Sequence, residues 1–63
     1  MQKMMNDELF IKKALLDTQE RVRDYMKYSE QTNDSALKSC FRDFAKTEGE
    51  HAQTLQTFIS KLQ

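Results

Sequence analysis

The chain has 63 residues, of which ten are basic and ten acidic, and it contains one cysteine, one glycine and no proline or tryptophan. A chain of this length forms at most one small domain, near the lower limit for burying a core of its own. Balanced charge gives no excess that would attract nucleic acid or an anionic membrane, and a single cysteine excludes an internal disulfide and a cysteine-based zinc motif. Because the apolar runs are too short for a membrane span, we expect a protein of the cytoplasm.

Residues from about 7 to 30 are predicted to form a first helix, because the segment lacks Gly and Pro and is rich in good helix formers. Asn6 or Asp7 is expected to cap its start. Steps of about 100° per residue place the apolar residues on one stripe. The stripe contains Ile11, Leu15, Thr18, Val22 and Tyr25, with Ala14 and Met26 beside it and Leu9, Phe10 and Leu16 widening it.

A polar segment of turn-forming residues, from about 31 to 35, follows the first helix. It precedes a second predicted helix from about 35 to 62, which Asn33, Asp34 or Ser35 can cap. The apolar stripe of this helix includes two titratable residues near its centre, whereas Glu50 points away. Its members are Leu37, Phe41, Phe44, Glu48, His51, Leu55, Phe58, Ile59 and Leu62, with Cys40 and Ala52 on the flanks.

Two long helices joined by a short polar turn predict an all-α fold, an antiparallel helical hairpin that forms a single domain over residues 1–63. A lone hairpin would leave Phe10, Leu16, Phe41 and Ile59 partly in water. We therefore expect two hairpins to pair about a two-fold axis as a homodimer, or as a higher homo-oligomer, and to complete a four-helix bundle.

The most informative motif is Glu48-x-x-His51, which places a carboxylate and an imidazole on one helical face. Such groups are rarely buried without a partner, because their charged forms lose hydration. The motif supplies half of what a helical bundle needs to hold a carboxylate-bridged metal pair. The alternative is a buried or half-buried polar pair without a metal.

The segment Glu48-Gly49-Glu50-His51-Ala52-Gln53-Thr54-Leu55 with Phe58 resembles the second helix of rubrerythrin-type ferritin-like proteins, which show Glu-x-Glu-His-Ala-x-x-Leu and a following aromatic. The first helix is similar in length and in its segment from Tyr25 to Tyr28. The hairpins of F-type spore coat proteins, which are also ferritin-like, look comparable. The resemblance covers almost the whole chain and implies half of a ferritin-like bundle, completed by dimerisation.

The resemblance also implies a metal-binding carboxylate seven residues before Tyr25, but Thr18 stands there. Asp17 and Glu20 are the nearest acids, and helical stepping places both off the stripe. A two-fold dimer would then offer two Glu48 and two His51, whereas a di-iron site of this type uses four Glu and two His. Four ligands suffice for one zinc or one iron ion; otherwise these side chains pair with their own copies.

Two functions follow from these observations. One is a ferritin-like homodimer that binds iron or zinc through Glu48 and His51, with Asp17 and Glu20 as weaker candidates. The other is a non-catalytic structural or interaction protein of the spore coat type, located in the coat, which kept the hairpin without a complete di-iron site and binds other proteins in a larger assembly. Catalysis of the rubrerythrin type, an oxidase or peroxidase activity, is the less favoured expectation, because Thr18 replaces a ligand.

Overall fold

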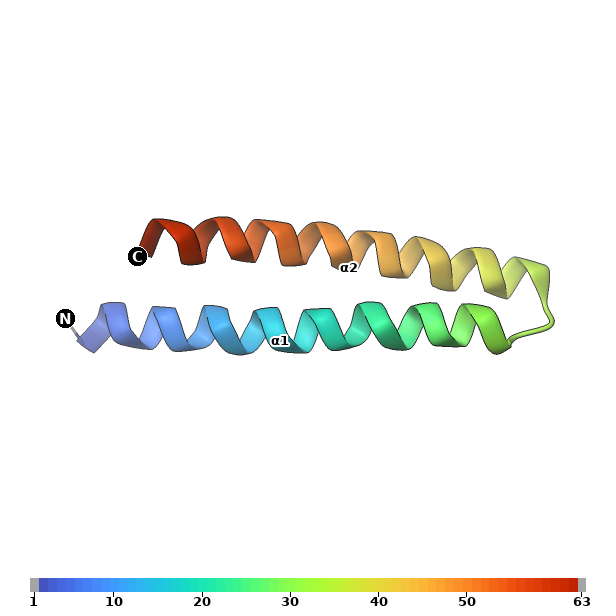
Figure 1. The fold of residues 1–63 in the computed structure, drawn as a ribbon, viewed down its shortest axis with the longest axis horizontal. Helices are drawn as coiled ribbons and strands as arrows, with labels where there is room; N and C mark the ends of the chain where they lie inside the picture. Colours follow the sequence, from blue (N-terminus) through green and yellow to red (C-terminus); the bar gives the residue numbers. More distant parts are fainter. Residues whose placement is uncertain (1, 63) are drawn as a thin grey trace.

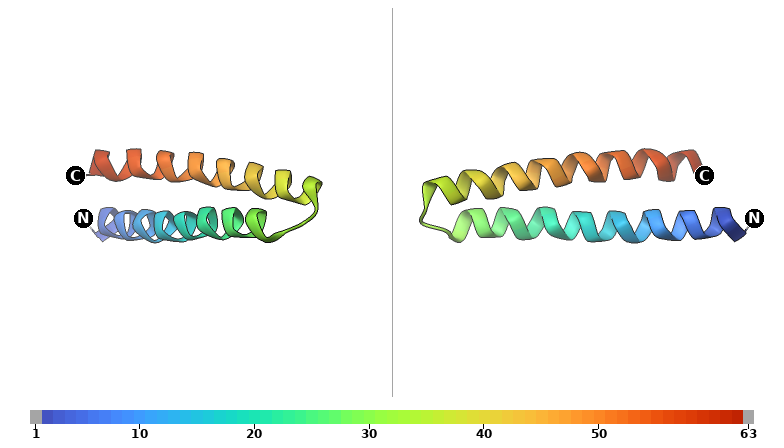
Figure 2. Two further views of the ribbon diagram at one scale, coloured as in Figure 1. Left: turned by 45° about the vertical axis from the view of Figure 1, so that its right-hand side comes forward. Right: turned by 180° about the vertical axis from the view of Figure 1, so that it is seen from behind.

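The computed structural model describes the backbone of residues 2–62 and the side chains of residues 6–62. Two helices, α1 (Gln2–Gln31) and α2 (Ser35–Leu62), run antiparallel and are joined by residues 32–34 (Figure 1). They lie side by side along their whole length in every view (Figure 2) and form a rod of 50 × 14 × 12 Å. The predicted all-helical fold and the helical hairpin are confirmed.

The turn between the helices is fixed by its own polar side chains. Asp34 caps α2, because its Oδ1 accepts a hydrogen bond from the backbone N–H of Leu37 at 2.8 Å. The hydroxyl of Thr32 accepts one from the N–H of Asp34 at 3.2 Å. The ammonium of Lys38 donates to the carbonyl oxygen of Ser29 at 2.6 Å and ties the start of α2 to the end of α1.

The first helix begins earlier than predicted, at Gln2 instead of about residue 7. Neither Asn6 nor Asp7 is a cap, since both lie inside the helix. The cause is the composition of the first residues, which contain no Gly or Pro and therefore let the helix continue toward its start. Within residues 2–62, neither helix holds an apolar stretch of the length that crossing a bilayer requires.

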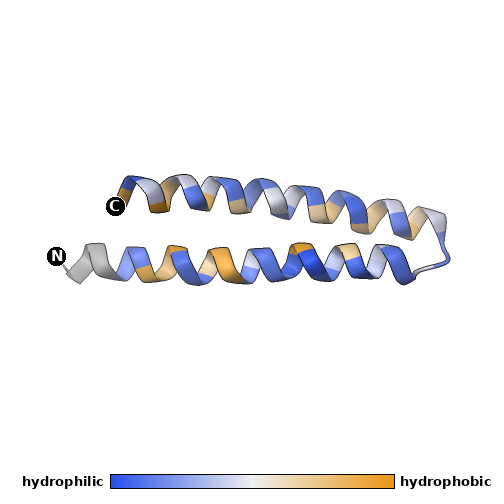
Figure 3. Cartoon of the chain, viewed as in Figure 1, coloured by the Kyte–Doolittle hydropathy of each residue, from blue (hydrophilic) through white to orange (hydrophobic). Residues whose placement is uncertain are grey.

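The contact between the helices is narrow and lined by small side chains. Thr18 and Ser29 of α1 and Ala45 of α2 are the buried residues among residues 6–62, and Ala45 is the one apolar member. Larger side chains such as Ile11, Leu55 and others along the contact are half-buried. Hydrophobic segments recur along both helices (Figure 3). A single hairpin therefore lacks the enclosed apolar core that stabilises most small domains.

One side of the hairpin leaves a row of apolar residues in water. Leu37, Phe44 and Phe58 are exposed, and together with His51 they follow one another at intervals of seven residues on α2. On α1, Phe10, Arg21 and Tyr28 share a stripe by the same helical stepping. We call this side, with these seven residues, the open face.

Two contacts place the two stripes on the same side of the hairpin. Arg21 contacts Glu48, beside the α2 row, and Phe10 lines a common hollow with Phe58. The predicted exposure of Phe10 and Leu16 is confirmed, and Phe41 and Ile59 are half-buried as expected. Leu16, however, lies about 160° around α1 from Thr18 and so does not belong to the open face.

Candidate functional site

Glu48 directs its carboxylate into the contact between the helices at the middle of α2. Its side chain is 18% exposed, and its Oε1 lies 3.3 Å from the Nε of Arg21. That oxygen is buried, and no group of residues 6–62 donates a hydrogen bond to it. The attraction to Arg21 is thus an ion pair without hydrogen-bond geometry, and the carboxylate keeps unused accepting capacity.

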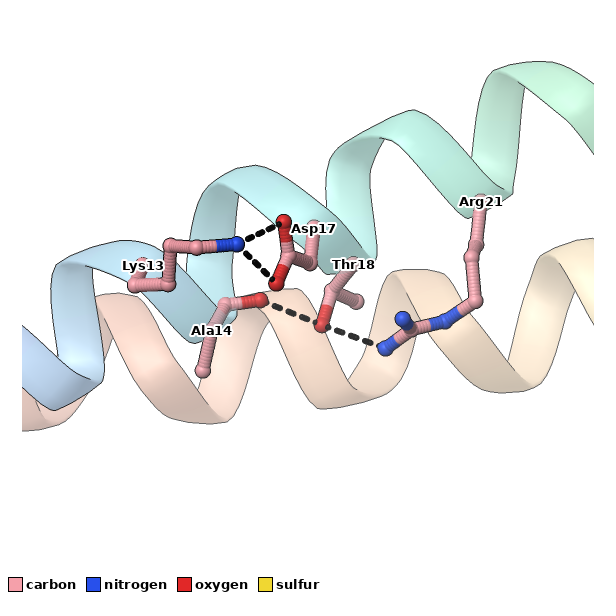
Figure 4. A network of polar contacts seen from close by, with 5 residues as sticks. All are labelled: Lys13, Ala14, Asp17, Thr18 and Arg21. Atoms are coloured by element: carbon pink, nitrogen blue, oxygen red, sulfur yellow. Dashed lines mark hydrogen bonds and ion pairs between the residues drawn. The ribbon is translucent and has the colours of Figure 1, made fainter.

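Thr18 and Arg21 of α1 direct their polar atoms toward α2 (Figure 4), where Arg21 contacts Glu48. The Thr18 hydroxyl donates a hydrogen bond to the carbonyl oxygen of Ala14 at 2.7 Å and accepts one from Nη2 of Arg21 at 3.2 Å. Arg21 therefore bridges the two helices, because its guanidinium contacts Thr18 on α1 and Glu48 on α2. The sequence placed Thr18 at the centre of the α1 stripe, and its burial confirms this position.

His51 lies at the edge of the contact. Its Nδ1 is 3.7 Å from Oε1 of Glu48, close enough for an ion pair when the imidazole is protonated, and 62% of its side chain is exposed. The reason is that α2 packs on α1 through the side that carries Ala45 and Ala52, which turns His51 outward onto the open face. The motif is therefore one inward carboxylate and one outward imidazole.

The two weaker candidates lie away from this pair. Asp17 accepts hydrogen bonds from the ammonium of Lys13 at 2.9 and 2.8 Å, one turn earlier on α1 (Figure 4). Glu20 is exposed. Across the part of the chain that the structure describes, no three His, Cys, Asp or Glu residues gather as a metal ion would require. A single hairpin thus brings together only Glu48 and His51 of the predicted ligands.

The guanidinium of Arg21 beside Glu48 disfavours a metal ion at this carboxylate. A ligating carboxylate needs its oxygens free to face the ion, but here Arg21 occupies the space next to Oε1, and Thr18 offers a hydroxyl that is already bound to two partners. Within one hairpin the residues do not fit the di-iron centre that the resemblance implies. A metal site would need ligands from outside the single hairpin.

Two features were not foreseen from the sequence. Ser29 is fully buried and donates a hydrogen bond to the carbonyl oxygen of Met26 at 2.6 Å. Ser29 lies three turns after Thr18, so helical stepping places both residues on the same side of α1 and could have indicated its burial. Four rings also gather near the turn into what we call the aromatic cluster, which consists of Tyr25, Tyr28, Phe41 and Phe44.

Comparison with known proteins gives no match: no protein-family model, no curated protein and no solved structure matches this chain. The resemblance to rubrerythrin-type and spore coat proteins therefore stays a prediction from sequence.

Proposed function

We propose that this protein is a self-associating structural hairpin, two copies of which pair through their open faces and close one four-helix bundle. The observation that carries the proposal is the open face itself. Apolar residues at seven-residue spacing are the pattern by which helices pack on neighbouring helices in bundles and coiled coils. A hairpin that leaves such a row in water has a helix-packing surface without its partner.

The exposed area supports the same proposal. The chain exposes 5084 Å², whereas a compact protein of 7.5 kDa exposes about 4,200 Å². The surplus of roughly 800 Å² equals what each partner typically loses in a stable protein–protein interface. The radius of gyration of 14.7 Å also exceeds the roughly 11 Å of a compact chain of this length. Pairing along the rod would remove both excesses.

The experiment is sedimentation equilibrium of the wild type and two serine variants. We expect the wild type to sediment with twice its chain mass of 7.5 kDa. Phe44→Ser, on the open face, should raise the dissociation constant at least tenfold. Leu16→Ser is the matched control, because Leu16 is exposed but lies off the open face. Leu16 is 64% exposed and Phe44 is 47% exposed, so if exposure alone decided, the dissociation constant would rise more in Leu16→Ser. A monomeric wild type, or equal effects of both substitutions, would refute the proposal.

A transition metal held between two copies is the second candidate function. The observation in its favour is the buried Oε1 of Glu48, which accepts no hydrogen bond from the described side chains and lies 3.7 Å from Nδ1 of His51. Two copies would supply four such ligands, which suits one zinc or iron ion. Arg21 is the observation against it, because a second cation next to Glu48 is repelled by the guanidinium.

Metal binding is tested separately from self-association. Titration of the apo protein with Zn²⁺ or Fe²⁺, followed by elemental analysis, should give one metal per dimer if this candidate is right, and the uptake should disappear in His51→Ala. The primary proposal expects a dimer that takes up neither metal. Location in a spore coat or in the cytoplasm stays a prediction in both cases.

A further inference from the structure

A hollow lies on the open face at the end of the rod far from the turn. It has a volume of about 490 Å³, and its walls come from both helices. Phe10 and Phe58, two of the most exposed large apolar side chains of the described chain, stand in these walls. The residues that line it are Asp7, Phe10, Ile11, Phe58, Lys61 and Leu62.

The aromatic cluster lies at the other end of the rod, on the same side. The Tyr25 ring packs within 6.2 Å of Phe41 and 5.5 Å of Phe44, measured between ring centroids. Tyr28 and Phe44 remain substantially exposed. Rings that pack on each other and still face water present a firm apolar surface, which needs a concave apolar partner to be buried.

The hollow and the aromatic cluster lie on opposite sides of the middle of the hairpin, and their distances from it overlap. On α1, Thr18 is seven residues after Ile11 and seven before Tyr25; it is eight after Phe10 and ten before Tyr28. On α2, Glu48 is seven residues after Phe41 and ten before Phe58. At a rise of about 1.5 Å per residue, the residues that line the hollow lie roughly 10–21 Å from the level of Thr18 and Glu48, and the four rings lie roughly 6–15 Å from it on the other side.

This inference rests on the proposed self-association. We propose that the second copy lies antiparallel on the open face, related by a two-fold axis that crosses the rod at the level of Thr18 and Glu48. In this arrangement the aromatic cluster of each copy fills the hollow of the other, and the two Arg21–Glu48 pairs meet at the axis. A parallel pairing would set hollow against hollow and rings against rings, which leaves unfilled space at one end and crowding at the other.

The test is the distance between spin labels in the dimer, measured by double electron–electron resonance. Ser35→Cys in a Cys40→Ser background places a label on an exposed residue at the turn. The antiparallel pairing predicts a distance of roughly 40 Å between the two labels, since Ser35 is thirteen residues from Glu48. A parallel pairing predicts about 20 Å or less, because paired helices lie 8–10 Å apart.

Glu50→Cys in the same background is the control, because this exposed residue lies near the middle of the rod. Its labels should lie within about 30 Å of each other in either arrangement, since the bundle is only two helices wide, and their coupling reports that a dimer has formed. A short Glu50 distance together with a short Ser35 distance would overturn the antiparallel inference and leave the dimer standing. A monomeric mass with no dipolar coupling at either position would overturn the proposed function as well.

Oxidation of the wild type gives a second measurement that needs no substitution. Cys40 is half-buried, free and eight residues from Glu48. The antiparallel pairing holds the two Cys40 residues about 24 Å apart along the rod, far beyond the reach of a disulfide. Mild oxidation should therefore yield no disulfide-linked dimer. Rapid, complete cross-linking at low protein concentration would contradict the arrangement.

Discussion

Replacing Arg21 with methionine is expected to destabilise the protein more than replacing Glu48 with glutamine, although the two side chains form one ion pair. The Arg21 side chain is 47% exposed, so without its partner the guanidinium keeps much of its hydration. The Glu48 carboxylate is only 18% exposed and buries one oxygen completely. Loss of Arg21 therefore strands a charge in the interior, whereas loss of the Glu48 charge strands none.

The loss of unfolding free energy in Arg21→Met should lie between the values measured for buried and for exposed ion pairs. Breaking a fully buried pair costs about 3–5 kcal/mol, and breaking an exposed pair costs less than about 1 kcal/mol. With one partner half exposed, we expect Arg21→Met to lower the free energy of unfolding by about 1–2 kcal/mol. Glu48→Gln should change it by less than about 0.5 kcal/mol. For a domain of this size, the Arg21 change corresponds to a fall in Tm of roughly 5–15 °C.

The assay is urea and thermal unfolding followed by circular dichroism, at one fixed protein concentration because a dimer's stability depends on it. The double variant Arg21→Met, Glu48→Gln completes a cycle. It should be more stable than Arg21→Met alone, since no stranded carboxylate remains, with a coupling of about 1 kcal/mol. Single effects that add within about 0.3–0.5 kcal/mol would show that the pair is uncoupled and would refute this reasoning.

The remaining predictions use the same unfolding assay. Asp34→Ala removes the cap of α2 and should cost about 1 kcal/mol, whereas the neighbouring Asn33→Ala should change little. Gly49→Ala should stabilise the protein by up to about 1 kcal/mol, because a Cβ there meets no atom within 4 Å; a loss of stability would place the second copy against that side of α2. His51→Leu should leave the dimer intact or stabilise it, since an exposed imidazole on an apolar face is replaced by a hydrocarbon. A chelator should not change the Tm of the wild type, and a fall on chelation or in His51→Leu would favour the metal-bound dimer.

Helical periodicity and turn chemistry were sufficient to predict the hairpin. Of the three residues predicted to cap α2, Asp34 is the one that does so. Its short carboxylate can reach the first free N–H groups of the helix. Thr18 is buried where steps of about 100° placed it.

The exposure of His51 could not be predicted from periodicity. The apolar stripe of α2 is wider than one neighbouring helix can cover, and stepping alone does not say which half faces α1. The small side chains of Ala45 and Ala52 decide this, because they let the helices approach on that side and turn His51 outward. Propensity likewise gives no sharp start for α1, since the residues before Asp7 favour a helix as much as those after it.

The beginning of α1 and the end of α2 lie together at one end of a rod 50 Å long (Figure 1). In an antiparallel pair, the end of one copy is therefore a full rod length away from the beginning of the other. A peptide that fuses two copies into one polypeptide has to run back along the bundle, which takes at least about 15 extended residues. Two hairpins fused through a shorter connector could not pair with each other. Each hairpin would then pair with a hairpin of another molecule, and open chains of molecules would form.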